Sequence, residues 1–184
     1  MSRSIYLVGF MGAGKTTVGR LLAASHDLPF RDLDEEIVRG EGASIAQLFQ
    51  SAGEAGFRQL ECRYLESLAG PAVVALGGGA FMTAAIREWI ADHGVSVYLR
   101  WSADELWRRV ADDPARPLAR DEQAFRRLLA EREPVYQQAD FWVLGGSPPR
   151  QPDELTEAIS SLLASGERTM PRAHLSDSSP DSML

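Results

Sequence analysis

Residues 9–16 read Gly9-Phe10-Met11-Gly12-Ala13-Gly14-Lys15-Thr16, and this stretch decides the fold of the chain. It matches the pattern G-x-x-x-x-G-K-[ST] of a P-loop, whose backbone N–H groups surround phosphate oxygens. An apolar run from Ile5 to Val8 precedes the loop, and an apolar stripe at helical spacing follows over residues 16–24. A strand, a glycine-rich loop and a helix in this order predict a binding site for a nucleoside triphosphate.

Lys15 is the single lysine in a chain of 184 residues that has 18 arginines and no asparagine. A coding bias that replaces lysine wherever arginine serves would leave this composition. The one remaining amine lies where a compact ammonium differs chemically from a planar guanidinium. We therefore expect Lys15 to reach the β- and γ-phosphates and the Thr16 hydroxyl to bind Mg²⁺.

Composition narrows the class of protein. Apolar residues make up 45% of the chain, and its length suits one sizeable core. A net charge of -7 argues against binding nucleic acid. The single cysteine, Cys62, fits a reducing compartment, and no apolar run reaches the roughly 20 residues of a membrane span. Because the N-terminus shows no signal sequence either, we expect a cytoplasmic monomer without membrane partners.

Strand-like and helix-like segments alternate along the chain. The predicted strands cover residues 5–8, a stretch opening at 28–30, 72–76, 95–99 and 141–144. The predicted helices cover residues 16–24, two patterns between 44 and 68, then 84–91, a segment capped by Ser102, 122–133 and 153–163. This alternation predicts an α/β fold in which helices cover both faces of a parallel sheet. We expect residues 165–184 to form a disordered tail.

Two carboxylates follow the second predicted strand. Asp32 and Asp34 are the acids at the C-terminal end of a predicted strand, the edge at which ligands bind in such sheets. In an extended Asp-x-Asp both side chains would point into one cleft. Asp32 is the better candidate for Mg²⁺ and Asp34 for an acceptor hydroxyl, although Asp34 could also serve as a helix N-cap.

The triplet Gly77-Gly78-Gly79 directly follows a predicted buried strand and offers bare backbone to a ligand. Arg58 lies one helical turn before Glu61, which could fix its guanidinium. Taken alone, Arg58 and Arg132 would be interpreted as solvated surface charges.

Together these segments resemble the shikimate kinase family over about residues 3–163. The resemblance rests on six blocks in a specific order: the P-loop, Asp32-Leu33-Asp34, the segment from Ser44 to Glu61, Gly77-Gly78-Gly79-Ala80, Arg116-Pro117-Leu118 and Arg132-x-Pro134-x-Tyr136. It implies a P-loop kinase fold with a five-stranded parallel sheet, formed by one unit over residues 1–164. An acceptor-binding segment would cover about 34–62 and a short lid about 112–121.

The resemblance also implies the roles of individual residues. Shikimate would be bound by Asp34, Arg58, Gly78, Gly79 and Arg132, the two arginines holding its carboxylate. ATP would be bound by Gly12, Ala13, Gly14, Lys15, Thr16, Thr17, Arg109, Arg116 and Arg150. Asp34, Lys15 and Arg116 would be catalytic, and Thr16 and Asp32 would hold Mg²⁺.

The implied reaction transfers the γ-phosphoryl group of ATP to the 3-hydroxyl of shikimate. Two alternatives remain open at this point. A related kinase could act on gluconate or on a nucleoside monophosphate, although segment 35–57 leaves little room for a base-reading pocket. A catalytically silent nucleotide-binding module is the second alternative, because a fold alone does not establish activity.

Overall fold

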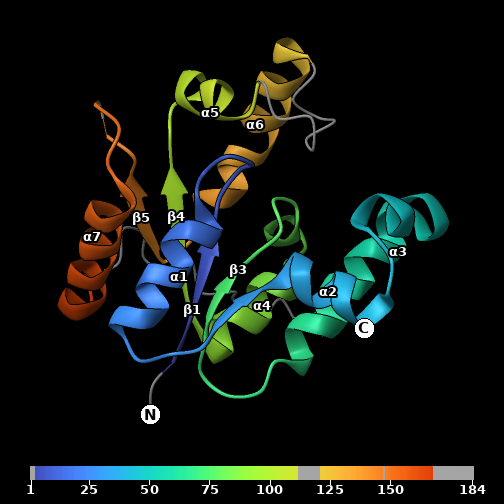
Figure 1. The fold of residues 1–184 in the computed structure, drawn as a ribbon, viewed down its shortest axis with the longest axis horizontal. Coiled ribbons are helices and arrows are strands. Elements are labelled where there is room, and N and C mark those ends of the chain that lie inside the picture. The colour runs from blue at the N-terminus through green and yellow to red at the C-terminus, as the bar shows by residue number, and fades with distance from the viewer. Residues whose placement is uncertain (1–2, 112–120, 147, 168–184) are drawn as a thin grey trace, which may run out of the picture.

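The computed structural model describes residues 3–111, 121–146 and 148–167. These residues build a five-stranded, all-parallel sheet with the strand order β2-β3-β1-β4-β5 (Figure 1). The strands are β1 (Ser4–Val8), β2 (Phe30–Asp32), β3 (Val73–Ala75), β4 (Gly94–Arg100) and β5 (Phe141–Leu144). The predicted fold class is confirmed.

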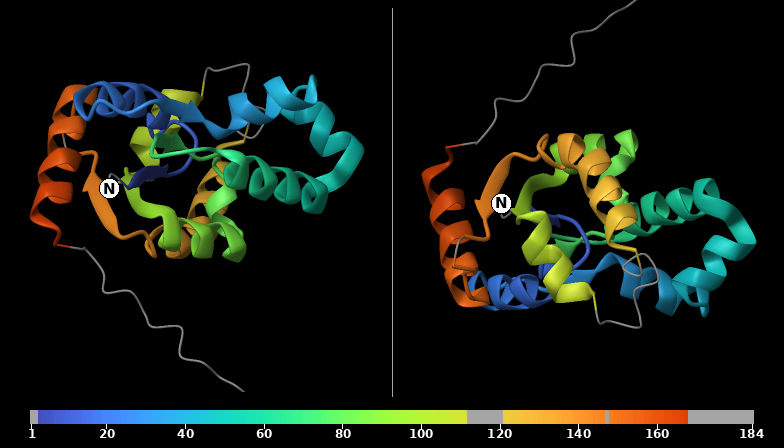
Figure 2. Two further views of the ribbon diagram at one scale, coloured as in Figure 1. Left: turned by 90° about the horizontal axis from the view of Figure 1, so that it is seen from below. Right: turned by 90° about the horizontal axis from the view of Figure 1, so that it is seen from above.

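Helices cover both faces of the sheet. α1 and α7 pack together on one face, α4 and α6 lie on the other, and α2 and α3 extend beyond the β2 edge (Figure 2). The helices are α1 (Lys15–Ser25), α2 (Leu33–Glu41), α3 (Ile45–Ser67), α4 (Ala84–His93), α5 (Ala103–Val110), α6 (Glu122–Tyr136) and α7 (Pro152–Ser165), with a short 3₁₀ turn η1 (Ala80–Met82).

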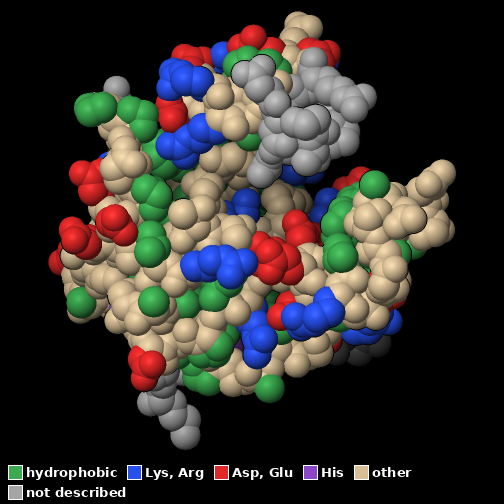
Figure 3. All heavy atoms as spheres, viewed as in Figure 1, with side chains coloured by type: hydrophobic (Ala, Val, Ile, Leu, Met, Phe, Trp, Pro, Cys, Tyr) green, Lys and Arg blue, Asp and Glu red, His purple; other side chains and the backbone are tan. Residues whose placement is uncertain are grey.

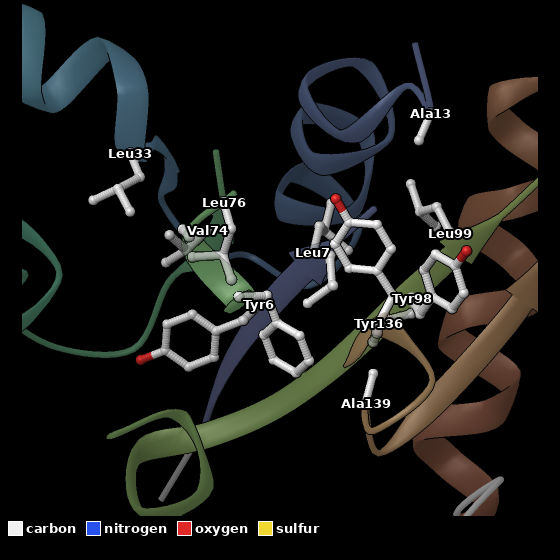
Figure 4. Close-up of a cluster of buried hydrophobic side chains, with 14 of the residues drawn as sticks. Tyr6, Leu7, Ala13, Leu33, Val74, Leu76, Tyr98, Leu99, Tyr136 and Ala139 are labelled. Atoms are coloured by element: carbon white, nitrogen blue, oxygen red, sulfur yellow. The ribbon is translucent and has the colours of Figure 1, made fainter. Parts of the chain in front are cut away.

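The central strand β1 is buried along its whole length. Leu7 pairs with Ala75 of β3 on one side and with Val97 of β4 on the other. The core continues to the far side of β4, where the rings of Tyr98 and Tyr136 lie 5.3 Å apart (Figure 4). Since all strands run parallel, the loops that follow them meet at one edge of the sheet.

Several element boundaries differ from the prediction, and α2 was not among the predicted helices. β2 begins at Phe30 instead of Leu28, and Pro29, which lacks an N–H, contributes only its carbonyl to β3. The two helices expected between 44 and 68 are confirmed: α3 consists of two helical segments that meet at the non-helical Gly53 (φ 66°, ψ -178°). α6 continues past Pro134 to Tyr136, because a proline in the last turn removes only one hydrogen bond.

The predicted lid falls mainly on residues 112–120 and the predicted tail mainly on 168–184, both outside the described residues. Among the described helices, none combines the length and the apolar character needed to cross a membrane.

Candidate active site

The P-loop connects the end of β1 to the start of α1. Gly14, the N-cap of α1, has φ 86°, a left-handed conformation that favours glycine. The first turn of α1 contains no acidic residue, so its N–H groups and the positive end of the helix remain available to an anion. The sequence and the backbone agree on a phosphate site here.

The Lys15 ammonium lies inside the curve of this loop. Its Nζ donates to the carbonyls of Gly9, at 2.8 Å, and Phe10, at 3.1 Å. These contacts hold the ammonium beside the backbone N–H groups that would surround phosphate. The position fits the role predicted for Lys15.

Thr16 and Asp32 meet across the end of the sheet. The Thr16 hydroxyl donates to Asp32 Oδ2 at 2.8 Å. A hydroxyl and a carboxylate oxygen at this separation fit Mg²⁺, which prefers oxygen ligands and keeps several waters and phosphate oxygens of its own. No group of three or more His, Cys, Asp or Glu that could hold a metal occurs within the described ranges.

Asp34 reaches the same cavity by a different route from the one predicted. The Asp-x-Asp is not extended, because α2 begins at Leu33 and places Asp34 in its first turn. Asp32 is the N-cap of α2, accepting from the Asp34 N–H at 3.2 Å, so the N-cap role considered for Asp34 was wrong. Both carboxylates nevertheless line one cavity.

Arg58 is fixed on α3 by two acids. Its Nη1 donates to Glu61 at 2.6 Å and its Nη2 to Glu54 at 3.1 Å. The rings of Phe49 and Phe57 stack 4.3 Å apart and lie within 6 Å of the guanidinium. Arg58 is therefore largely buried, in contrast to the solvated charge that its sequence neighbourhood alone would suggest.

The glycine triplet joins Arg58 to Arg132 of α6. Arg132 Nη1 donates to the Gly78 carbonyl at 3.2 Å, and the hydroxyl of the fully buried Tyr136 donates to the same oxygen. Within the described part of the chain, the N–H groups of Gly78 and Gly79 have no hydrogen-bond acceptor. Since Gly79 is buried and lines the cavity, its N–H is available to a ligand or to an ordered water.

The predicted phosphate and acceptor residues in the described part of the chain line one cavity of about 490 Å³. Lys15 and Thr16 lie at its phosphate end, while Arg58 and Arg132 line it together with Asp34. Figure 3 shows a hollow between the body of the molecule and α3, in which positive and negative side chains gather. The cavity is polar and carries opposite charges, as expected for anionic substrates.

Burial raises the pKa of two acidic side chains that line the cavity. Burial raises the pKa of Asp34, nearby Asp32 raises it further, and Lys15 and Arg58 oppose the shift. Burial also raises the pKa of Glu61 to about 7, against the opposing effect of Arg58. Asp34 therefore has a higher proton affinity than an ordinary aspartate.

Glu61 should make stability depend on pH. Because its pKa rises from 4.5 to about 7 on folding, the folded protein binds the proton more tightly between those values. The free energy of unfolding should therefore fall as pH rises through this window, by up to about 3 kcal/mol. Urea unfolding at pH 5 and pH 8 measures this, and Glu61→Gln should show a smaller decline than the unsubstituted protein. Equal declines in the two proteins would contradict the assignment to Glu61.

A second cavity of about 400 Å³ lies on the other side of the P-loop. Arg109 and Arg150 both line it, together with Gly12, Ala13, Gly14 and Thr17. Two of the three arginines predicted to contact ATP are thus brought together beside the phosphate loop. Arg116 lies outside the described residues.

Sequence reasoning overlooked two buried aromatic side chains. Tyr136 belongs to the block Arg132-x-Pro134-x-Tyr136, and its spacing of four residues from Arg132 places both on one face of α6. Trp101 was not singled out at all. It contacts Ala13, 88 residues away in the chain, and no local pattern signals such a contact.

A parallel sheet with a P-loop after its central strand, and a charged cavity at the strand ends, defines a small-molecule kinase of the P-loop class. The family model for shikimate kinase matches residues 11–163. The chain belongs to the shikimate kinase family.

Individual relatives agree with this assignment. The shikimate kinase of Cereibacter sphaeroides is 44% identical over 151 residues, which are 79% of this chain and 76% of the relative. The shikimate kinase of Mesorhizobium japonicum is 48% identical over 149 residues, or 77% and 72% of the two chains. The structure of the Acinetobacter baumannii enzyme in complex with shikimate superposes with a TM-score of 0.82. It is 38% identical, and the match covers 91% of this chain and 96% of that one.

Proposed function

We propose that this chain transfers the γ-phosphoryl group of ATP to the 3-hydroxyl of shikimate, giving 3-phosphoshikimate and ADP. One observation carries the proposal: a single cavity joins the phosphate loop to Arg58 and Arg132, with Asp34 also lining it. Shikimate carries both a carboxylate and hydroxyl groups, which complement the arginines and the aspartate. The transfer depends mainly on positioning and charge stabilisation.

The phosphate end comprises Gly12, Ala13, Gly14, Lys15, Thr16 and Thr17. Their backbone N–H groups and the Lys15 ammonium would neutralise charge that develops on the transferred group. Thr16 and Asp32 would hold Mg²⁺, which when bound offsets the phosphate charge. The hydrogen bond between the two side chains supports this pairing.

The acceptor end would be formed by Arg58, Arg132, Gly78 and Gly79. The guanidinium groups match a carboxylate, and the N–H groups of the two glycines, which have no acceptor among the described residues, would donate to it as well. Asp34 would orient the attacking hydroxyl and accept its proton late in the transfer. Burial of Asp34 raises its pKa and so strengthens it as a proton acceptor.

The remaining roles follow from the family resemblance. Arg109 and Arg150 would contact the nucleotide, which their shared cavity supports. Arg116 would complete the charge set around the phosphates when the lid segment 112–121 closes. We further propose that the chain acts as a monomer in the cytoplasm. Its single cysteine fits this reducing compartment.

A coupled assay of ADP release tests the substrate. Shikimate, gluconate, AMP and CMP are offered separately with MgATP. Shikimate alone should stimulate release well above the rate without acceptor. Faster release with gluconate or a nucleotide would favour the related-kinase alternative, and nucleotide binding without release for any acceptor would favour the silent module.

Gly79→Ala should weaken shikimate binding selectively. A Cβ at this position would lie 2.3 Å from Arg58 Nη2 and 2.7 Å from its Cζ, so the guanidinium must leave its place beside Glu61. The backbone at Gly79 (φ -107°) accepts alanine without strain, which makes the effect purely steric. Steady-state kinetics should show the KM for shikimate raised about tenfold with the KM for ATP unchanged. A normal KM for shikimate would contradict the assigned role of Arg58.

A further inference from the structure

Trp101 directly follows β4 and lies where several segments of the nucleotide side meet. Its side chain is buried, and its indole Nε1–H donates to the Ala13 carbonyl of the P-loop at 3.1 Å. Its ring faces Arg109, whose Cζ lies 3.6 Å from the ring centroid. One side chain thus contacts both the phosphate loop and an arginine of the second cavity.

Gly145, the residue directly after β5, packs against the same indole. A Cβ on Gly145 would lie 1.9 Å from Trp101 Cε3, so only glycine permits this approach. The Gly145 carbonyl accepts from the Arg150 N–H at 2.7 Å, so Arg150 is held close to the glycine that lies against the ring. Trp101 and Arg150 both line the second cavity.

Trp101 combines two properties that no other side chain offers at this place. Its ring provides the strongest cation–π surface for a guanidinium. Its N–H satisfies the carbonyl of Ala13, a residue that is 1% exposed and has little access to water. Phenylalanine would retain a ring but leave this carbonyl unpaired.

We propose that Trp101 is a positioning residue of the nucleotide site, which fixes Arg109 beside the P-loop and so sets the affinity for ATP and ADP. Arg109 also donates to Glu105 at 2.8 Å and to the Gly12 carbonyl at 3.4 Å. An arginine already ordered in this way loses less side-chain entropy when the nucleotide binds. This inference rests on the proposed function in one respect, namely that ATP and ADP are the nucleotides bound.

Direct binding tests the proposal without requiring turnover. The dissociation constant of ADP is measured by isothermal titration calorimetry for the unsubstituted protein, Trp101→Phe and Trp101→Leu. Loss of the hydrogen bond should weaken ADP binding about fivefold in Trp101→Phe. Loss of the ring as well should weaken it about thirtyfold in Trp101→Leu. Trp89→Phe, a matched change on α4 beside His93, should leave ADP binding unchanged.

A purely structural role for Trp101 predicts a different pattern. In our account, the KM for ATP rises in both variants while kcat and the KM for shikimate stay within about twofold. A folded Trp101→Leu with unchanged ADP affinity would overturn the proposal, as would equal losses in ATP and shikimate affinity. If Trp101→Leu does not fold, Trp101→Phe decides alone. Calorimetry remains decisive even if shikimate is not the acceptor.

Gly145→Ala provides an independent arm. The added methyl group must displace the indole, so ADP binding should weaken in the otherwise unsubstituted protein. In the Trp101→Leu background the methyl group meets a smaller side chain, and its effect should largely disappear. Additive effects of the two substitutions would contradict a shared action through the ring.

Discussion

Lys15→Arg should reduce kcat about 100- to 1000-fold while the protein remains folded. The ammonium is a compact charge held between the carbonyls of Gly9 and Phe10, inside the curve of the P-loop. A guanidinium is longer and planar, and it cannot occupy this space without moving the loop. Steady-state kinetics with MgATP and shikimate measure the loss, and thermal unfolding verifies that the fold is intact.

Chemical labelling supplies a matched measurement on the unsubstituted protein. An amine-reactive reagent can modify only Lys15 and the N-terminus, since the chain has no other lysine. MgATP should protect Lys15 and leave the N-terminus reactive, which serves as the internal control. Near-normal activity in Lys15→Arg, or labelling of Lys15 that MgATP does not slow, would show that the lysine has no role in transfer.

Asp34→Asn should have a comparable effect on kcat, exerted at the acceptor end of the same transfer. The amide keeps the shape of the side chain but cannot accept the hydroxyl proton, so kcat should fall about 100- to 10,000-fold. ADP affinity should remain unchanged, because Asp34 is assigned to the acceptor and not to the nucleotide. The pH profile should also change: in the unsubstituted enzyme, activity should fall with decreasing pH through a pKa above that of ordinary aspartate.

Glu35→Gln is the matched control for this substitution. Glu35 lies next to Asp34 in the first turn of α2, but its side chain is exposed and contacts Arg20 at 3.5 Å. Removing its charge changes the same helix terminus without touching the cavity, so kcat should stay close to normal. A loss in Glu35→Gln as large as in Asp34→Asn would indicate an effect of α2 stability instead of chemistry.

The sequence alone was sufficient for the fold class and for much of the site, although it did not predict the helix α2. Each buried strand has an apolar run and each helix an apolar stripe, and the P-loop motif fixes how one strand connects to one helix. The structure brings Lys15, Asp34, Arg58 and Arg132 to one cavity, as predicted. Lys15 and Asp34 were predicted from local patterns, whereas Arg58 and Arg132 were assigned only through the family resemblance, and Arg132 contacts Gly78, which is 54 residues away.

Predictions failed where local geometry or distant contacts decide the outcome. The hydrogen bond from the Asp34 N–H to Asp32 starts α2 early, which an extended Asp-x-Asp pattern does not anticipate. The environment of Trp101 depends on residues of the P-loop, α5 and the segment after β5. Only the folded chain brings these segments together.

The central claim is that Lys15 and the arginines Arg58 and Arg132 form two ends of one path for phosphoryl transfer to shikimate. Phosphorus NMR of the product formed from MgATP and shikimate tests it most directly. The account predicts one new phosphate ester signal, coupled to the proton at carbon 3 of the ring. Phosphate on another hydroxyl, or release of inorganic phosphate alone, would contradict it.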